Sequence, residues 1–409
     1  MSGAASGSGG DTAAPPATVL TFNHGSSSLK FGLFHVSGDD ATSLASGEIE
    51  TLGNGKARLH AASTDGGVLV DRAIGAADHR ESIGHIFGLL DGSALPAPTA
   101  IGHRVVHGGP ALLDHVRIDA AVMEQLERAR AFAPLHLPQA LAVIHAARHH
   151  FPDVPQFACF DTAFHAGMPP VAATLPLSAR LRELGLRRYG FHGLSCESIV
   201  RQLGPDLPER LIIAHLGNGA SVTAVRAGRS VDTSMGLTPT GGLIMGTRTG
   251  DLDPGVLIHL LREHGYTAET LERLVDRESG LLGISGLDSD VRVLNPAATT
   301  NPAARLAIEM FRQSLGKTIA SMAQVLGGAD MIVFTGGIGE HDAAMRATAG
   351  ASLAWLGVKV DPVRNDAGRG RISTDSSRIA LRVLVSQEDM EIARHSVALL
   401  AGPPRCIAQ

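Results

Sequence analysis

The chain has 409 residues, of which 44% are hydrophobic and 18% charged, and its formal net charge is −5. This length exceeds one typical hydrophobic core, so we expect two domains. One Trp, two Tyr and an acidic balance argue against a nucleic-acid partner, which would need stacking side chains and excess positive charge. Cys159, Cys196 and Cys406 form no C-x-x-C pair, which argues against a disulfide framework and favours a reducing cytoplasm.

The first segment, residues 1–17, has no basic residue and no apolar run, so it predicts a disordered tail and not a signal peptide. No stretch approaches the ~18 consecutive apolar residues of a membrane helix, so no membrane partner is expected.

Strand-like and helix-like segments then mix along the chain, which is typical of the α/β class. Val19–Phe22 and Leu29–Leu33 predict a strand–turn–strand hairpin with a polar tip. Asp119 is placed to cap a helix, a second helix is expected up to about His150, and Gln156–Phe160 predicts a buried strand. Further on, Asn301-Pro302 predicts the start of a long helix that stops at Gly327-Gly328.

The hairpin pattern recurs. Residues 211–225 again read as apolar strand, Gly-rich turn and apolar strand, and in an alignment with residues 19–33 His215 falls on Asn23. A third Gly-rich turn, residues 335–340, follows the predicted strand Met331–Phe334. Two similar hairpins predict a duplicated domain whose two turns face one another across a cleft.

The turn Asn23-His-Gly-Ser-Ser-Ser-Leu-Lys30 has the composition of a phosphate-binding loop. Small residues leave backbone N–H groups and hydroxyls open to a polyanion, and Lys30 adds a point charge. The alternative is a tight hairpin whose serines satisfy their own backbone. Three such turns in one chain favour phosphate binding.

Other enzyme classes fit less well. The chain contains no G-x-x-x-x-G-K-[ST], no G-x-G-x-x-G and no protein-kinase motif set. Ser27-Ser-Leu-Lys30 is an S-x-x-K sequence, which would allow a serine acyl-enzyme. That chemistry requires the nucleophile at the start of a helix, whereas the alternation after Ser28 predicts a strand, and the S-D-N element is missing.

Charged residues beside glycines and strand ends are the candidate site residues. Arg104 and Arg248 lie in Gly-flanked segments suited to gripping a planar oxyanion, although a structural salt bridge is the alternative for each. Asp161 follows a strand and could serve a metal, catalysis or a helix N-cap. His192 lies between glycines, unlike a packed core histidine, and Glu388 is either a metal ligand or part of a helix cap.

Together these segments resemble the acetate/propionate kinase family within the actin-like, sugar-kinase and Hsp70 ATPase superfamily. The resemblance runs from about residue 18 to the C-terminus through NHGSSSLK, GHRVVHGG, APLH, FDTAFH, RRYGFHG, HLGNGAS, DTSMGLTP, MGTRTGDLDPG, LGISG, TGGIGE and QED. It implies two duplicated actin-like (ribonuclease H-like) ATPase domains around a central cleft. The implied boundaries are 18–163 plus 389–409 for the N-terminal domain and 164–388 for the nucleotide-binding domain.

The resemblance also implies a reaction and its residues. Members form acetyl phosphate and ADP reversibly from acetate and ATP by direct in-line transfer with Mg²⁺, or Mn²⁺ in its place, and a cytoplasmic homodimer is expected. The implied positions are Asp161, His192 and Arg248 for catalysis; Arg104, His136, Val106, Leu135, Phe191 and Pro239 for the substrate; Asn23 and Glu388 for the metal; and Lys30, His215, Leu216, Gly217, Asn218, Gly219, Asp290, Val291, Arg292, Gly337, Ile338, Gly339, Glu340 and His341 for ATP.

The chemistry agrees with most of these roles. A carboxylate is already ionised at neutral pH, so its attack on phosphorus needs no general base. Asp161, which the family treats as its acid/base, is therefore better interpreted as orienting the metal shell. The sequence departs from the family pattern at His24, Leu137, Leu194, Cys196, Gly241 and His341. Of these, Leu137 and Leu194 bear on the acyl preference, and His341 bears on how adenine is held.

Two alternatives stay open. Propionate or butyrate could replace acetate, because one methylene is worth only ~1–3 kcal/mol in such a pocket. A non-catalytic nucleotide switch is the other alternative, but such a module has no need of Arg104, Arg248, His192 and Asp161 together.

Overall fold

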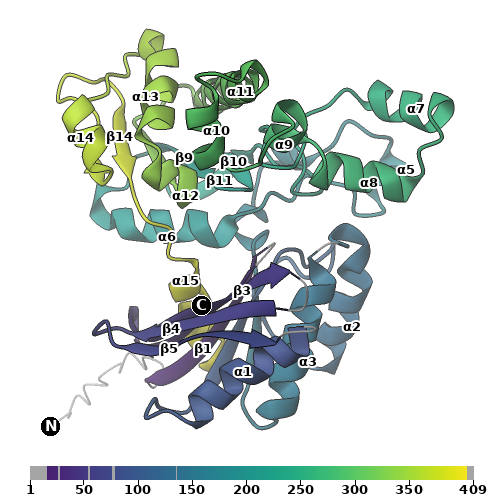
Figure 1. Ribbon diagram of the computed structural model, residues 1–409, viewed down its shortest axis with the longest axis vertical. Helices are drawn as coiled ribbons and strands as arrows, with labels where there is room; N and C mark the ends of the chain where they lie inside the picture. The colour runs from purple at the N-terminus through teal and green to yellow at the C-terminus, as the bar shows by residue number, and fades with distance from the viewer. Residues whose placement is uncertain (1–15, 26–27, 54–55, 76–78, 135, 403–409) are drawn as a thin grey trace, which may run out of the picture.

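The computed structural model describes residues 16–25, 28–53, 56–75, 79–134 and 136–402. Figure 1 shows two α/β lobes, one above the other, with the last helix returning to the lobe in which the chain begins. Leu135, Ser26 and Ser27, and most of the predicted tail, lie outside the described residues. Ala17, predicted as the last tail residue, is the first residue of the first strand and is buried.

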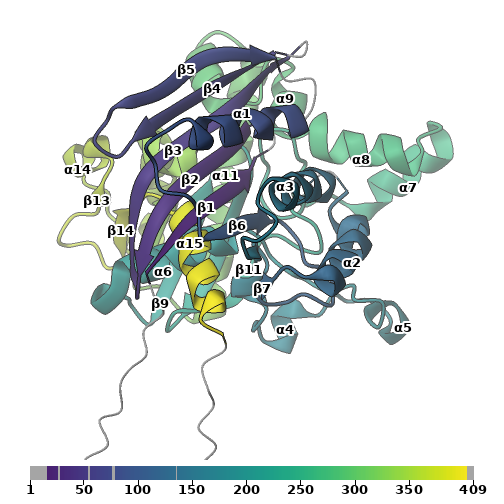
Figure 2. The ribbon, with the colours of Figure 1, turned by 90° about the horizontal axis from the view of Figure 1, so that it is seen from below.

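The first lobe contains an eight-stranded sheet in the order β5-β4-β3-β2-β1-β6-β8-β7. Its strands are β1 (Ala17–His24), β2 (Ser28–Ser37), β3 (Asp40–Gly53), β4 (Lys56–Ser63), β5 (Val68–Gly75), β6 (Ala100–Val105), β7 (Val116–Arg117) and β8 (Gln156–Phe160). Its helices are α1 (His79–Asp91), α2 (Ala120–Ala129), α3 (Leu137–His150) and the final α15 (Glu388–Leu400). Seen from below, α1 and α3 lie on one side of the strands and α15 on the other (Figure 2).

The second lobe contains a six-stranded sheet in the order β11-β10-β9-β12-β14-β13. Its strands are β9 (Arg210–Leu216), β10 (Ala220–Arg226), β11 (Arg229–Thr233), β12 (Met331–Thr335), β13 (Gly370–Arg371) and β14 (Ala380–Val383). The helices between β8 and α15 are α4 (Pro170–Ala173), α5 (Ala179–Arg182), α6 (Gly193–Leu203), α7 (Pro254–Glu263), α8 (Ala268–Arg277), α9 (Gly280–Ser285), α10 (Val291–Ala297), α11 (Pro302–Leu326), α12 (Gly336–His341), α13 (Ala343–Ser352) and α14 (Pro362–Ala367).

The two sheets repeat one arrangement, which confirms the predicted duplication. In the first sheet β1 pairs antiparallel with β2 and parallel with β6, which pairs parallel with β8. In the second sheet β9 pairs antiparallel with β10 and parallel with β12, which pairs parallel with β14. Asn23 and His215 occupy corresponding places, each one residue before the end of its strand.

Most of the predicted elements are confirmed. The Asp119 side chain accepts a hydrogen bond from Val122 N and caps α2, and β8 has the predicted bounds. Asn301 caps α11 through Ala303 N, and α11 ends before Gly327, whose φ of 70° favours glycine. The third Gly-rich turn differs from the prediction, because residues 336–341 form the short helix α12.

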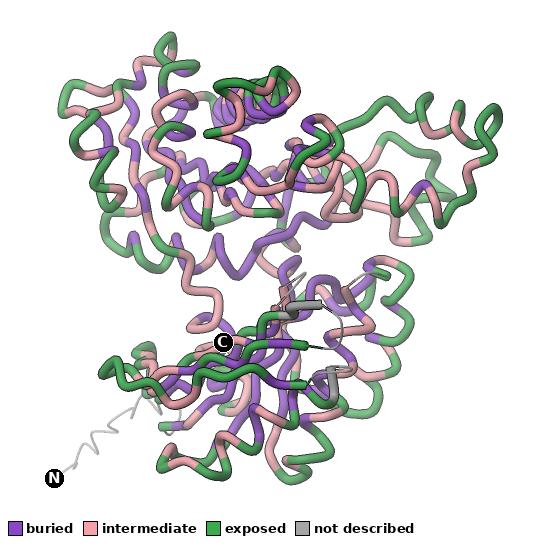
Figure 3. Tube along the Cα trace, viewed as in Figure 1, coloured by how far each residue is buried: buried purple, intermediate pink, exposed green. Residues whose placement is uncertain are grey.

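Each lobe has a buried interior (Figure 3), in which apolar side chains form a core. In the second lobe the stripe Phe311, Leu315 and Ile319 of α11 is fully buried beneath β9 and β10. In the first lobe Leu20 of β1 and Ile83 of α1 belong to one buried cluster. The cavity between the lobes is lined by many polar and charged side chains and by a few apolar ones, among them Val106, Phe191 and Pro239.

Helices α6 and α15 connect the lobes. The Arg201 Nε of α6 lies 3.0 Å from the buried carboxylate of Glu391 on α15, and His395 Nε2 lies 2.8 Å from Glu197 Oε2. Helix α15 also packs closely on β6. A Cβ added at Gly102 would lie 2.5 Å from both Ile392 Cγ2 and Ser396 Oγ.

This close approach predicts a specific sensitivity. Gly102→Ala should destabilise the protein by about 1–3 kcal/mol, because the added methyl group overpacks the contact between β6 and α15. Gly84→Ala is the matched control, since a Cβ there meets no atom within 4 Å and alanine favours the helix. Thermal unfolding monitored by circular dichroism measures both, and an unchanged midpoint for Gly102→Ala would contradict the packing described.

Candidate active site

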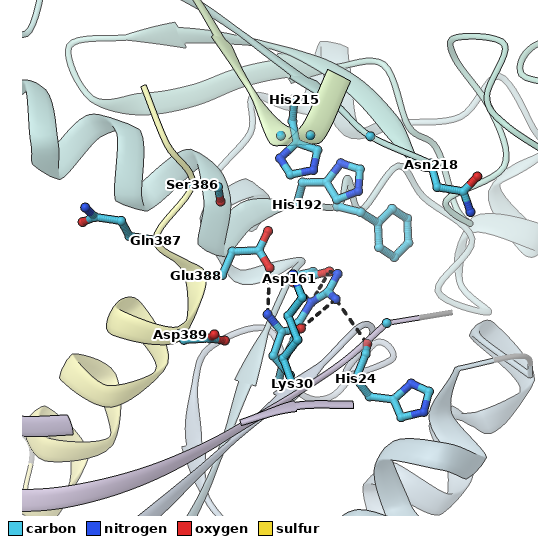
Figure 4. A pocket seen from close by; sticks show the side chains of 18 of the residues that line it. His24, Lys30, Asp161, His192, His215, Asn218, Ser386, Gln387, Glu388 and Asp389 are labelled. Atoms are coloured by element: carbon cyan, nitrogen blue, oxygen red, sulfur yellow. Dashed lines mark hydrogen bonds and ion pairs between the residues drawn. The ribbon is translucent and has the colours of Figure 1, made fainter. Parts of the chain in front are cut away.

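A cavity of about 750 Å³ lies between the lobes, and most of the predicted site residues line it (Figure 4). From the first lobe these are Asn23, Lys30, Arg104, Val106, His136 and Asp161. The remaining predicted residues on the wall are Phe191, His192, His215, Gly217, Asn218, Gly219, Pro239, Arg248, Gly337, Glu340, His341 and Glu388. The turns of the two hairpins therefore face one another across this cavity, as the sequence predicts.

Arg104 and Asp161 form a bidentate ion pair at the base of the cavity. Arg104 Nη2 lies 2.6 Å from Asp161 Oδ2, and its Nε lies 3.0 Å from Oδ1. Burial by itself raises the pKa of Asp161, and the adjacent Arg104 opposes that rise. Burial also lowers the pKa of Arg104, but Asp161 and Glu388 outweigh this effect and raise it. The charged pair thus joins Arg104 on β6 with Asp161, which directly follows the adjacent strand β8. The side chain of Asp161 therefore serves this ion pair and is not a helix cap.

Oxygen atoms that could bind a metal ion lie beside this pair. Arg104 Nη1 donates to Asn23 Oδ1 at 3.0 Å, and Asn23 Nδ2 donates to Glu388 Oε2 at 3.1 Å. Burial would raise the pKa of Glu388, but Arg104 and His215 lower it below its usual value, so the carboxylate is charged. The neighbouring Asp389 has a buried Oδ1 that makes no hydrogen bond within the described part of the chain. Carboxylate and amide oxygens are the ligands that Mg²⁺ prefers, so this donor set fits that ion.

Arg248 has a different environment from Arg104. Its Nη1 donates to Pro239 O and its Nη2 to His136 Nε2, both at 3.3 Å. Among the described residues no carboxylate lies within 4.0 Å of its guanidinium, and burial lowers the pKa of Arg248. Burial and the charge of Arg248 lower the pKa of His136 to about 3, so His136 is a neutral acceptor. A partly buried cation without a carboxylate partner is suited to an anionic ligand.

Two stacked imidazoles, those of His192 and His215, line the same cavity as the Arg104–Asp161 pair. The rings of His192 and His215 lie 4.1 Å apart at 21°, and burial lowers the pKa of both, so both are neutral at pH 7. His192 has a left-handed backbone, with φ of 59°, and directly precedes α6. Such strain in a non-glycine residue occurs most often at functional sites. A Cβ at Gly219 would lie 3.4 Å from His192 Nε2 and 3.3 Å from Arg248 Nη1, so a glycine leaves this corner open.

Some predicted nucleotide contacts do not line the cavity. Leu216, Asp290, Val291, Arg292, Ile338 and Gly339 lie outside its wall, and Leu135 lies outside the described residues. The Arg292 side chain is 88% exposed and lies 2.6 Å from Asp290, whose carboxylate caps α10. Leu216, Val291 and Gly339 are buried in the fold of the second lobe.

Other wall residues were not predicted. They include Ser386, Gln387 and Asp389, whereas His24 and Ser28, which are also on the wall, belong to the turn predicted to bind phosphate. Asp389 could have been found from its position next to Glu388. Ser386 gives no comparable signal, because its place follows from how the chain crosses between the lobes.

Comparison with known proteins identifies the family of the chain. The sequence profile of the Acetokinase family matches residues 18–394. The chain belongs to the acetokinase family. It is 40% identical over 391 residues to the acetate kinase of Nitrobacter hamburgensis, covering 94% of this chain and 96% of that one. It is 44% identical over 397 residues to the acetate kinase of Shewanella loihica, covering 93% and 98%.

Solved structures of the acetokinase family share the fold. A propionate kinase from Francisella tularensis superimposes with a TM-score of 0.86 at 34% identity, covering 93% of this chain and 99% of that one. The acetate kinase of Porphyromonas gingivalis gives 0.83 at 34% identity, covering 94% and 100%. Family membership makes the chain a kinase that uses ATP and a divalent cation. Among the described residues, no helix has the length and apolar character needed to cross a membrane.

The two arginines should differ in their effect on stability. Arg104→Met leaves the buried Asp161 carboxylate without its partner, which should lower the free energy of unfolding by about 3 kcal/mol or more. Arg248→Met removes a cation that has no carboxylate partner among the described residues, so without ligand the midpoint of thermal unfolding should stay unchanged or rise. Equal losses in the two variants would contradict this difference in pairing.

Proposed function

We propose that the chain transfers the γ-phosphate of ATP reversibly to acetate, giving acetyl phosphate and ADP. The observation that carries the proposal is the placement of Arg248. It faces the cavity with no carboxylate partner among the described residues, beside two neutral imidazoles and opposite the Arg104–Asp161 pair. The negative charge of a small carboxylate and of a transferring phosphoryl group would balance the positive charge of Arg248.

The reaction would proceed by direct in-line attack. The acetate carboxylate is ionised at neutral pH, so the barrier is repulsion between anions and not a missing base. Arg104 would bind that carboxylate, which competes with Asp161 for the guanidinium. Arg248 and His192 would stabilise the charge that develops on the phosphoryl oxygens. The bidentate contact supports Asp161 as the residue that orients Arg104, in addition to any effect on the metal shell.

The donor set supports a metal role for Asn23 and Glu388, with Mg²⁺ as the natural ion and Mn²⁺ as a substitute. When bound, the ion would neutralise phosphate charge and polarise the phosphate oxygens. The contacts with Arg104 and Glu388 fix the orientation of the Asn23 amide, whose single side-chain oxygen is Oδ1. Asp389, with its buried Oδ1, would take part in the same shell.

For the nucleotide, Lys30 and the turn Gly217–Gly219 would contact phosphates, and Gly337, Glu340 and His341 would lie near the base or ribose. We retain Leu216, Asp290, Val291, Arg292, Ile338 and Gly339 only as secondary candidates, since they lie off the cavity wall. Val106, Phe191 and Pro239 would form the small apolar pocket for the methyl group, together with Leu135. Acetate as the favoured acid is supported by the acetate kinases that are 40–44% identical to this chain.

The surroundings lead to three further proposals. The domains would divide at residues 163/164 and 388/389, which is supported by the packing of α15 on β1 and β6. The free, buried thiols of Cys159 and Cys196 suit the reducing cytoplasm.

A homodimer is the third of these proposals. Val256, Ile258 and Leu261 of α7 are 41–47% exposed, on a helix that projects from the second lobe (Figure 1). A second copy would cover them. Light scattering on the purified protein should give twice the 42.5 kDa chain mass, and a monomer at micromolar concentration would refute the dimer.

One assay tests the activity. The protein is incubated with ATP, Mg²⁺ and formate, acetate, propionate or butyrate, and acyl phosphate is trapped with hydroxylamine. Acetate should give the highest kcat/KM. Propionate should follow within about 10- to 200-fold, because one methylene is worth ~1–3 kcal/mol. No product with any acid would reject the proposed function.

Arg248→Met provides the matched control for that assay. The variant should fold, for the reason given above, yet lose roughly 10³-fold in kcat, the range seen for arginines that stabilise phosphoryl transfer. Activity close to that of the parent chain would remove Arg248 from the reacting centre.

A further inference from the structure

Three side chains from separate elements form a hydrogen-bonded chain behind His215. Ser386, in the segment between β14 and α15, donates from its Oγ to Ser195 Oγ at 3.0 Å. Ser195, on α6, lies 2.8 Å from His215 Nδ1 on β9. Ser195 is fully buried.

The direction of this chain determines which ring nitrogen carries the proton. A hydroxyl has one hydrogen, and Ser195 already accepts from Ser386. If Ser195 also accepted from His215, its own hydrogen would be buried without an acceptor among the described residues. Ser195 therefore donates to His215 Nδ1, and the proton of the neutral imidazole is on Nε2.

Nε2 of His215 faces the cavity side of the ring. A Cβ at Gly217 would lie 4.0 Å from this nitrogen, so it borders the turn Gly217–Gly219. The ring is also held by stacking on His192. The opposite tautomer would present a lone pair at this turn, which would repel an anionic oxygen, whereas Nε2–H can donate to it.

We propose that Ser195 and Ser386 are positioning residues that hold His215 as the Nε2–H tautomer, so that it donates a hydrogen bond to a phosphate oxygen of the nucleotide. The tautomer follows from the hydrogen bonds alone, and only the identity of the acceptor rests on the proposed function. The lowered pKa of His215, caused chiefly by burial, keeps the imidazole neutral and the choice of tautomer meaningful.

The chain also links His215 to the crossing between the lobes. Ser386 N donates to Glu340 Oε1 at 3.1 Å, and Gln387 N donates to Ser198 Oγ at 3.2 Å. The crossing segment is thus fixed to α6 and α12 where it passes the cavity. The position of the proton on the His215 ring therefore depends on the crossing segment being in place. The same crossing also brings Glu388 to Asn23.

The test uses the full-length protein with ¹⁵N-labelled histidine. Long-range ¹H–¹⁵N spectra without ligand should show a protonated Nε2 and an unprotonated Nδ1 for His215, whose signals are assigned by their loss in His215→Gln. Ser195→Ala should shift His215 to a mixture of tautomers or to Nδ1–H. Ser386→Ala should weaken the bias, and Ser386→Thr should restore it.

Ser321→Ala is the control, because it removes a helix hydroxyl that donates to Thr318 O within α11, away from His215 and from the crossing segment. It should leave both the tautomer and turnover unchanged, whereas Ser195→Ala should lower kcat about 10- to 100-fold, by analogy with the loss of a group that orients a metal-bound histidine. An Nδ1–H signal in the parent protein, or an Nε2–H signal that persists in Ser195→Ala, would overturn the proposal. If the tautomer is as expected but the parent forms no acyl phosphate, the positioning role stands and the proposed function fails.

Discussion

The bidentate contact between Arg104 and Asp161 is the interaction on which the cleft depends. A carboxylate that is 1% exposed is tolerated only with a partner, and the guanidinium supplies that partner in a planar, fixed geometry. Because Arg104 also donates to Asn23, the same contact orients the amide that reaches Glu388. Strands β1, β6 and β8 and helix α15 are thus joined at the cavity by these polar contacts, in addition to the apolar cluster that they share.

The second arginine shows why this pairing matters. Arg104 is compensated and structural without ligand, whereas Arg248 contacts a neutral histidine and a carbonyl oxygen. A protein that places one paired and one carboxylate-free guanidinium around a cavity can hold its fold and still offer unsatisfied positive charge to an anion. This division of tasks would let a chain of net charge −5 bind the two anionic substrates of the proposed reaction in one cleft.

Much of the fold was accessible from the sequence because its signals are local. The hairpin alternation after Ser28, the cap at Asp119 and the Pro-early, Gly-late pattern of α11 depend on neighbouring residues alone, and all three are confirmed. The conformation of residues 336–341 was harder to predict from the sequence. Their glycines favour a turn, but a long-range context that includes Glu340 and the crossing at Ser386 closes them into a helix.

The sequence by itself determined the duplicated hairpins, the glycine turns and the identity of the charged residues, since spacing and residue type carry that information. Only the tertiary structure decided which arginine is paired, that Arg292 points to solvent, and that Ser386 reaches His215 through Ser195. These facts depend on contacts between segments far apart in the chain. Hydrogen-bond direction and burial, which set proton positions and charge, arise only when those segments meet.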